Sequence, residues 1–450
     1  MRQLRLVEYE KIAALAGGLP RRVADGLVIA GEDFAALKTM LLTADDRDDD
    51  LGVLLKPCLW NGREALQVRN YAGVIMLPSG LGLEILPKIG RAEDDGSVER
   101  ARAILLKMLR AWPDGPYRTF EQAALAGGKA PLLEVFITCF LNDVGELIRR
   151  GLCSDYVAVE DNQIFLRGKL MLPEHIRRNA ARQERFYVRF DEFLADRPEN
   201  RLVKSALLQV EKWSRDDENQ RRRKIHDQAF TDVPPSRDVA ADIAACRRDR
   251  NLQHYNAALS WCRLLLRGQS PIPQAGSHSC LSILFPMEKL FEHYVAVELR
   301  RLLAESGWRV EEQARQRHLV ESHDDKPCYT LQPDLLFTKK NRFPQKDRRV
   351  VADTKWKRLN SAADVAQEDL YQLFAYGEKY LEEKKLSFLI YPKTDDFRRP
   401  PPPFWFRDKV HALQALPYDL EKDECDVRTI MDEWFIEQER IEEAESEEAR

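Results

Sequence analysis

The sequence predicts a multidomain α+β protein with a β-rich N-terminal domain, a mainly helical middle region and a C-terminal α/β core whose mixed sheet is flanked by helices. Short apolar runs broken by Gly, Pro and Asn fill residues 1 to about 95, as in small strands. From about residue 98, apolar residues recur at three-to-four spacing, which is typical of helices. After residue 277, helical and strand-like runs alternate. A length of 450 residues exceeds one typical core, so two or three domains are expected.

These changes of pattern define the expected domains. We expect a β-rich N-terminal domain over 1–95, a helical region over 96–267, an α/β domain over 277–436 and an acidic tail over 437–450. The stretch 268–276 contains two prolines and is typical of a linker. The tail has seven Glu against two Arg, which is typical of a solvated helix end or a disordered tail.

The first two regions contain a series of expected elements. A turn over 78–82 should join two strands in a hairpin. In the middle region, a two-stranded element is expected on either side of Glu160-Asp161-Asn162, and residues 215–224 are expected to be a polar connection or a helix end. The expected strands are Gly26–Ile29, Leu66–Arg69, Gly73–Leu77, Leu83–Leu86, Tyr156–Val159 and Gln163–Leu166, and the expected helices are Val98–Trp112, Pro131–Gly151, Asn200–Trp213 and Asp238–Leu266.

The third region alternates helix and strand in a regular order. A helix is followed by three strands, a second helix and a fourth strand. In chain order these are Pro286–Ser306, Trp308–Glu312, Tyr329–Phe337, Arg349–Lys355, Asp364–Lys384 and Leu386–Tyr391.

The bulk composition excludes several classes of protein. A formal charge of −4 argues against a uniformly basic nucleic-acid coat, although a local basic groove remains compatible with it. Eight dispersed cysteines without a CxxC pair support neither a zinc ribbon nor an iron–sulfur cluster, and they fit a reducing compartment. No signal peptide and no apolar run of about 18 residues is present, so we expect a cytoplasmic protein.

Two acids and a lysine are the candidate catalytic groups. Asp334 follows a strand-like run, and Asp353 and Lys355 share one face of the next strand. Charges on a strand flanked by valines are costly when buried without partners. Mg²⁺, or Mn²⁺ in its place, would be such a partner, because hard cations prefer carboxylate oxygens and phosphate. Lys355 would then orient a water molecule and stabilise charge on the phosphate. This set predicts metal-dependent cleavage of a phosphodiester.

Two helices add candidate supporting groups. Gln372 and Tyr376 are four residues apart and share a helix face that could overlook Asp353. Glu288 and Glu292 are spaced in the same way on the earlier helix, and we favour Glu292 as a third metal ligand. Each pattern alone is also common in packing or on solvated faces.

A basic stretch near these residues predicts DNA contact. The residues predicted to bind DNA phosphates are Lys339, Lys340, Arg342, Lys357 and Arg358. The alternative is an ordinary solvated charged loop.

Several motifs together resemble the PD-(D/E)xK nuclease superfamily, in the subgroup with a trailing QxxxY, and within it the McrC family of McrBC modification-dependent restriction systems. The resemblance covers about 60 to 395. It rests on Pro286-Met287-Glu288-Lys289-Leu290-Phe291-Glu292, Pro333-Asp334-Leu335-Leu336, Ala352-Asp353-Thr354-Lys355-Trp356-Lys357, Asp369-Leu370-Tyr371-Gln372-Leu373-Phe374-Ala375-Tyr376, and more loosely on Leu83-Glu84-Ile85-Leu86-Pro87-Lys88 and Leu166-Arg167-Gly168-Lys169-Leu170.

The resemblance implies a partner and a role. It implies an endonuclease subunit acting on double-stranded DNA in phage defence, with Asp334, Asp353 and Lys355 at the catalytic positions. It also implies a β-rich N-terminal arm that docks into the pore of a hexameric AAA+ GTPase of the McrB type and stimulates it, while that partner reads the modified cytosine. Lys88 would then be a candidate pore contact, although an ordinary surface lysine is an equal alternative.

Two other functions remain open. The chain has no Walker A motif and no recognisable base-reading module, which fits dependence on a partner motor. A stand-alone RecB-like DNA exonuclease would also use these residues. A third possibility is an activator of a AAA+ motor that keeps only a vestigial nuclease fold.

Overall fold

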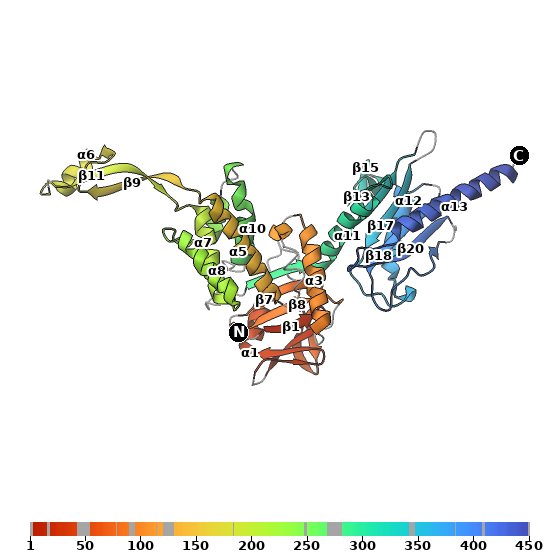
Figure 1. Cartoon of the computed structure of the whole chain (residues 1–450). Coiled ribbons are helices and arrows are strands. Elements are labelled where there is room, and N and C mark those ends of the chain that lie inside the picture. The colour runs from red at the N-terminus through yellow and green to blue at the C-terminus, as the bar shows by residue number, and fades with distance from the viewer. Residues whose placement is uncertain are drawn as a thin grey trace. The chain divides into compact units, whose positions relative to one another are not determined.

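The computed structural model (Figure 1) describes most of the chain. The described residues are 3–15, 19–42, 55–77, 79–89, 95–113, 115–119, 130–182, 184–246, 250–267, 281–341, 347–382, 384–406 and 410–448. They divide into two compact units. One consists of Val74–Gly82 and Ala130–Ile283, and the other joins Gln3–Gly73, Leu83–Lys129 and Leu284–Arg450. Apart from Val74–Gly82, the β-rich N-terminal segment thus belongs to the same unit as the C-terminal sheet.

The N-terminal segment is β-rich, as predicted. Five strands form a sheet in the order β3-β4-β2-β6-β5, and a second sheet has the order β1-β8-β7-β12. The predicted turn between β7 and β8 is present, because the Leu77 amide donates to the Leu81 carbonyl at 2.9 Å. The elements are β1 (Gln3–Val7), β2 (Lys11–Leu15), β3 (Arg21–Val23), β4 (Gly26–Ala30), α1 (Gly31–Leu42), β5 (Leu55–Trp60), β6 (Arg63–Val68), β7 (Tyr71–Met76), β8 (Gly82–Leu86), α3 (Asp95–Ala111), η1 (Pro116–Thr119) and β12 (Leu281–Pro286).

The C-terminal part is built on a six-stranded mixed sheet of order β13-β16-β17-β18-β20-β19, which confirms the predicted mixed arrangement. β13, β16 and β17 are antiparallel, whereas β17, β18 and β20 run parallel. Its elements are α11 (Met287–Leu303), β13 (Trp308–Glu312), β16 (Leu335–Lys339), β17 (Arg348–Thr354), η3 (Ala362–Asp364), α12 (Gln367–Tyr380), β18 (Lys385–Pro392), β19 (Phe404–Trp405), β20 (His411–Tyr418) and α13 (Val427–Glu448).

Helices pack on this sheet because both of its faces are apolar. α12 buries Leu373, Tyr376 and Tyr380 against Val351 and Leu389 of the sheet. Strand residues of the other parity, such as Phe337, Val350 and Phe388, are also fully buried, as expected for a sheet that is covered on both faces. α11 packs against β13 and β17, and Figure 1 shows α11 and α12 lying along the sheet.

Three sequence predictions in this part need correction. The single strand expected over 329–337 is split into β15 (Lys326–Leu331) and β16, and β15 pairs with β14 (Arg317–His323), which was not predicted. Pro333 lies at the break and has no amide hydrogen to donate to a sheet ladder. β19, β20 and α13 were also not predicted, and the boundary expected at 437 falls inside α13.

The other unit is mainly helical, as predicted. It contains α5 (Leu132–Arg150), α7 (Pro198–Trp213), α8 (Asp217–Ala229), α9 (Val239–Ala245), η2 (Arg250–Tyr255) and α10 (Asn256–Arg267). Gly151 ends α5 with φ 94°, as a C-cap glycine does. The polar stretch 215–224 lies mostly in α8, whose first turn is capped by the Asp216 carboxylate.

A long antiparallel arm extends from these helices (Figure 1). It consists of β9 (Asp155–Gln163), β10 (Lys169–Leu170), α6 (Leu172–Asn179) and β11 (Phe186–Leu194). The predicted turn at Glu160-Asp161-Asn162 is wrong, because β9 continues through these residues and pairs with β11 along its whole length. The Glu160 carboxylate instead accepts from Arg189 across the strand pair at 2.8 Å.

Gly377 tests the packing of α12. A β-carbon at this position would lie 2.2 Å from Cε1 of the buried His411 ring, whose Nε2 is 2.7 Å from Ser387 Oγ. We therefore expect Gly377→Ala to lower the free energy of unfolding by about 1–3 kcal/mol, as overpacking does. Chemical denaturation measures this, with Gly31→Ala as the control because nothing lies within 4 Å of a β-carbon there. Equal stability of both variants would contradict the packing described here.

Candidate active site

Asp353 and Lys355 meet at the end of β17. Lys355 Nζ lies 2.6 Å from Asp353 Oδ2 and donates to Gln372 Oε1 at 3.1 Å. Asp353 is only 2% exposed, and Lys355 is partly buried beside it. Lys355 is therefore held by Asp353, as their shared strand face predicted, and by Gln372 on α12.

Asp334 lies next to this pair. It comes directly before β16, and the register of β16 with β17 pairs Leu335 with Ala352. Its Oδ2 accepts from the backbone amide and the hydroxyl of Thr354, at 2.7 and 2.8 Å. These bonds orient the carboxyl group and leave Oδ1 without a hydrogen-bond donor among the described residues.

Gln372 and Tyr376 connect the strand to α12. Gln372 Nε2 donates to Tyr376 Oη at 2.8 Å and lies 3.3 Å from Asp353 Oδ1. The Tyr376 hydroxyl in turn donates to the Gln332 carbonyl at 3.0 Å. The two side chains therefore share one helix face, and the tyrosine fixes which way the glutamine amide points.

Of the two candidate glutamates, Glu292 is the one beside the cluster. It receives a hydrogen bond from Gln313, and its charge interacts with those of Asp334 and Asp353. Glu288 instead accepts from the Asn70 side chain at 2.9 Å, away from the acids.

The cluster carries more negative than positive charge. Burial, followed by repulsion from a neighbouring carboxylate, raises the pKa of both Asp334 and Asp353. Burial and the charge of Asp353 also raise the pKa of Glu292, against a hydrogen bond from Gln313. Burial alone would lower the pKa of Lys355, but the surrounding carboxylates outweigh it and raise that pKa. One ammonium group thus faces several acids.

Sequence reasoning missed Asp369. This buried acid on α12 lies 3.6 Å from Lys355 Nζ and 3.2 Å from Lys357 Nζ, so it holds both lysines. Its position three residues before Gln372, on the same helix face, was the available signal.

Sequence reasoning also missed the anchor of Trp356. The buried indole donates to the Glu8 carboxylate at 3.0–3.1 Å, and the Trp356 carbonyl accepts from Lys88 Nζ at 2.5 Å. Lys88 is 7% exposed, and its backbone amide also donates to Glu8. Lys88 is thus engaged by its own unit, and its contact with a partner's pore stays a prediction.

The predicted DNA-binding residues fall into two groups. Lys357 and Arg358 lie in the loop after β17 and are exposed. Lys339 pairs with Arg348 at the other end of β16, five residues or about 17 Å from Asp334. Lys340 follows it there, and Arg342 lies outside the described residues.

The acids fit a divalent metal ion. No group of three or more His, Cys, Asp or Glu side chains is close enough to hold a metal ion within the described ranges. Mg²⁺ needs only one or two carboxylates, however, with water and phosphate as its other ligands. Asp353 Oδ2 is buried and close to Lys355 but has no aligned hydrogen bond within the described part of the chain. Asp334 and Asp353 are therefore the residues that fit such an ion.

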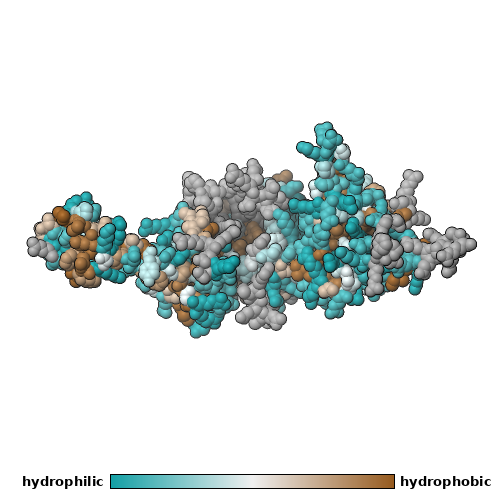
Figure 2. Space-filling model, turned by 90° about the horizontal axis from the view of Figure 1, so that it is seen from above, coloured by the Kyte–Doolittle hydropathy of each residue, from teal (hydrophilic) through white to brown (hydrophobic). Residues whose placement is uncertain are grey.

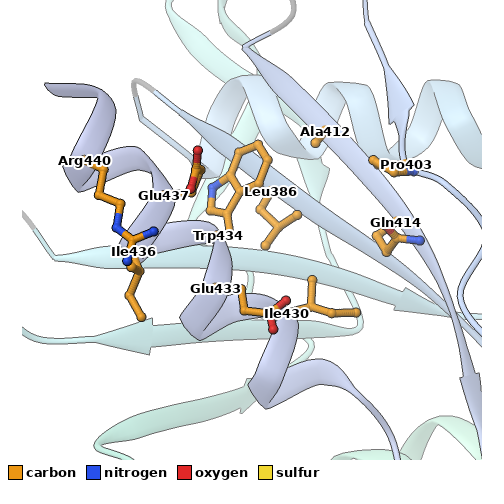
Figure 3. A pocket seen from close by; sticks show the side chains of 10 residues that line it. All are labelled: Leu386, Pro403, Ala412, Gln414, Ile430, Glu433, Trp434, Ile436, Glu437 and Arg440. Carbon is orange, nitrogen blue, oxygen red and sulfur yellow. The ribbon is translucent and has the colours of Figure 1, made fainter. Parts of the chain in front are cut away.

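A different pocket lies at the opposite end of the sheet. This groove lies between α13 and the beginnings of β18 and β20 and has a volume of about 570 Å³. Figure 3 shows the side chains that line it. It has no carboxylate–lysine cluster of its own among its lining residues, which are Leu386, Pro403, Ala412, Gln414, Ile430, Glu433, Trp434, Ile436, Glu437 and Arg440.

Comparison with solved structures shows a mixed α+β protein of McrC-like fold. A chain of the refined half-complex from the tetradecameric assembly of Thermococcus gammatolerans McrB AAA+ hexamers with bound McrC matches with a TM-score of 0.64 and 18% identity, over 93% of this chain and 94% of that one. A chain of the Thermococcus gammatolerans McrBC complex matches with a TM-score of 0.46 and 19% identity, over 70% and 90%.

The family model of the McrBC 5-methylcytosine restriction system component matches residues 66–392. The chain therefore belongs to this family, as its motifs predicted. No curated protein in the comparison matches it. Among the described residues, no helix has the length and apolar character needed to cross a bilayer.

The raised pKa values predict how stability depends on pH. Asp334 and Asp353 bind protons more tightly in the folded chain than in the unfolded chain, whose carboxyl pKa is about 4. Their contribution therefore falls as the pH rises from that value through the raised pKa values. Thermal unfolding in EDTA should show this loss in the wild type and a smaller loss in Asp353→Asn, and Mg²⁺ should reverse it in the wild type. Identical pH curves for the two proteins would contradict the assigned charge cluster.

Proposed function

We propose that the chain is the Mg²⁺-dependent DNA endonuclease subunit of a McrBC-like restriction complex, and that it also binds and stimulates a hexameric AAA+ GTPase. The observation that carries the catalytic part is the Lys355 ammonium group, which lies against Asp353 and Gln372 with Asp334 beside them. Acids, a lysine and a supporting glutamine at one corner of a mixed sheet are what hydrolysis of a phosphodiester requires. Family membership supports the same conclusion.

Each side chain has a distinct role in this proposal. Lys355 orients the attacking water and stabilises negative charge that develops on the phosphate oxygens. Gln372 holds the lysine on one side, and Asp369 holds it on the other at 3.6 Å. Tyr376 fixes the glutamine amide, which keeps its oxygen toward the lysine and its nitrogen toward Asp353.

Asp334 and Asp353 would hold the metal ion, with Glu292 close enough to act through its charge or a bound water. When bound, Mg²⁺ supplies charge neutralisation and polarisation of the phosphate. The apolar strands beneath the acids exclude water and strengthen these interactions. The chain's own residues would thus bind the metal ion and orient the attacking water.

The proposal that the chain binds a AAA+ partner rests on the arm formed by β9, β10, α6 and β11. Its β9–β11 ribbon and α6 expose many large apolar side chains, and Figure 2 shows brown, hydrophobic atoms gathered on this arm. Apolar side chains that cluster on a projecting element mark an interaction surface. The matched structure contains McrB AAA+ hexamers, so a McrB-like hexamer is the proposed occupant. The exposed residues are Tyr156, Val157, Ile164, Phe165, Leu166, Leu172, Ile176 and Phe193.

The cleavage step can be separated from the partner step. Asp353→Ala should reduce cleavage of methylated duplex DNA at least about a hundredfold, because loss of a metal carboxylate costs about 3 kcal/mol of barrier. GTP hydrolysis by the partner should stay stimulated in the same mixture. The control is Glu305→Ala, which changes an exposed acid two residues after α11 and outside the cluster.

The outcomes of that assay distinguish the alternatives. Equal cleavage by wild type and Asp353→Ala would refute the proposed site. Cutting of linear DNA without any motor would favour a stand-alone RecB-like exonuclease. Stimulation of the motor by a wild-type protein that neither binds Mg²⁺ nor cuts DNA would favour a vestigial activator.

The arm surface gives its own prediction. Leu172 and Ile176 are four residues apart on α6 and are 59% and 66% exposed. Changing both to Asp should lower stimulation of the partner's GTPase by about tenfold, because charges would replace apolar contact groups. Circular dichroism should show an unchanged fold, and Arg177→Ala on the same helix is the matched control. Undiminished stimulation would place the docking surface elsewhere.

A further inference from the structure

A second polar pocket lies beside the catalytic strand, within the same unit. It has a volume of about 350 Å³ and is lined by Val7, Glu8, Tyr9, Lys88, Lys357 and Arg358. Four of these residues come from the β-rich N-terminal segment, three of them at the end of β1 or directly after it and one after β8, and the other two come from the loop after β17. The pocket is therefore composite and depends on the packing of two distant parts of the chain.

The pocket is joined to the catalytic lysine through one carboxyl group. Asp369 Oδ1 lies 3.6 Å from Lys355 Nζ, and its Oδ2 lies 3.2 Å from Lys357 Nζ. Lys357 is half exposed and lines the pocket. A chain of phosphates that places one group at Lys355 would therefore place a neighbouring group near Lys357.

Three cationic side chains and one buried acid, Glu8, line the pocket. Burial is the largest cause of the lowered pKa of Lys88. The charges of Glu8 and Glu288 raise that pKa, and repulsion from Lys357 and Arg358 lowers it further. Arg358 has no hydrogen-bond or ion-pair partner among the described residues. A bound anion would relieve this repulsion and satisfy the free guanidinium group.

The walls of the pocket are held in place. Tyr9 has φ 74°, a backbone conformation that aromatic residues rarely adopt. Two hydrogen bonds maintain this conformation. The Tyr9 amide donates to the Val68 carbonyl, and the Gln67 side chain donates to the Tyr9 carbonyl. Its ring lies over Lys88, with Nζ 4.9 Å from the ring centroid, and remains 39% exposed. These two hydrogen bonds hold the strained backbone, and with it the aromatic ring beside the cations.

We infer that this pocket binds a backbone phosphate of the DNA strand next to the phosphate that is cleaved, with Arg358 and Lys88 as its cationic groups and Tyr9 as its wall. The inference rests on the proposed nuclease function and extends it, because it gives the N-terminal segment a direct part in holding DNA. A phosphate contact positions the strand without reading its sequence.

The salt dependence of DNA binding tests this site. Each lost phosphate contact lowers the slope of log affinity against log salt by about one unit. Fluorescence anisotropy of a short duplex with the full-length chain should show about fivefold weaker binding for Arg358→Ala at low salt, with the slope reduced in this way. Lys88→Gln keeps a donor for the Trp356 carbonyl but removes the charge, and it should reduce the slope similarly. Arg440→Ala, an exposed arginine at the opposite end of the sheet, is the matched control.

The outcomes separate this inference from the proposed function. If the wild-type protein binds and cuts DNA but Arg358→Ala and Lys88→Gln leave the salt slope of binding unchanged, the phosphate pocket is wrong and the proposed function stands. Reduced slopes in a protein that never cuts DNA with its partner would leave the pocket standing and overturn the proposed nuclease. A purely structural role for Lys88 would lower the melting temperature without changing the slope, and would likewise overturn its assignment.

Discussion

An excess of buried acid around a single ammonium group is the constraint on which the site depends. Asp334, Asp353 and Glu292 share a corner of the sheet with Lys355, and burial makes their ionised forms costly. These buried charges do not increase the stability of the fold, because apolar side chains of similar volume at the same positions would be more stable. It is maintained by rigid surroundings, namely Thr354 on one side and the Gln372–Tyr376 pair on the other.

The rigidity originates in the secondary structure. The antiparallel register of β16 with β17 sets Asp334 beside the end of β17. The parallel step from β17 to β18 requires a crossover, and α12 supplies both that connection and the glutamine that meets the lysine. The β17–α12–β18 crossover therefore forms part of the sheet, covers one of its faces and supplies a residue of the site.

The residues of the site could be foreseen because they obey local rules. Asp353 and Lys355 share a strand face, and Gln372 and Tyr376 share a helix face, so spacing alone brings each pair together. Asp369 also obeyed the helix rule but was overlooked. The anchoring of Trp356 by Glu8 could not be foreseen, since the two residues are far apart in the chain and nothing local links them.

Some elements of the fold were missed for similar reasons. The break at Pro333 has a local cause, since proline lacks the amide hydrogen that a sheet ladder needs. The length of β9 depends instead on its pairing with β11, which lies farther along the chain. Polar residues such as Asp161 and Asn162 favour turns in isolation. Continuous pairing with β11 overrides that preference, because a sheet ladder satisfies every backbone group along the ribbon.

The hydrogen bond between the Trp356 indole and Glu8 has a practical consequence. A fragment that begins at the linker would retain every catalytic side chain yet lose the acceptor for this indole and the lysine that caps the Trp356 carbonyl. A buried aromatic group on the segment that carries Lys355 would then face solvent. The residue that follows β1 is accordingly a support of the candidate active site, and Glu8 and Trp356 belong to one compact unit.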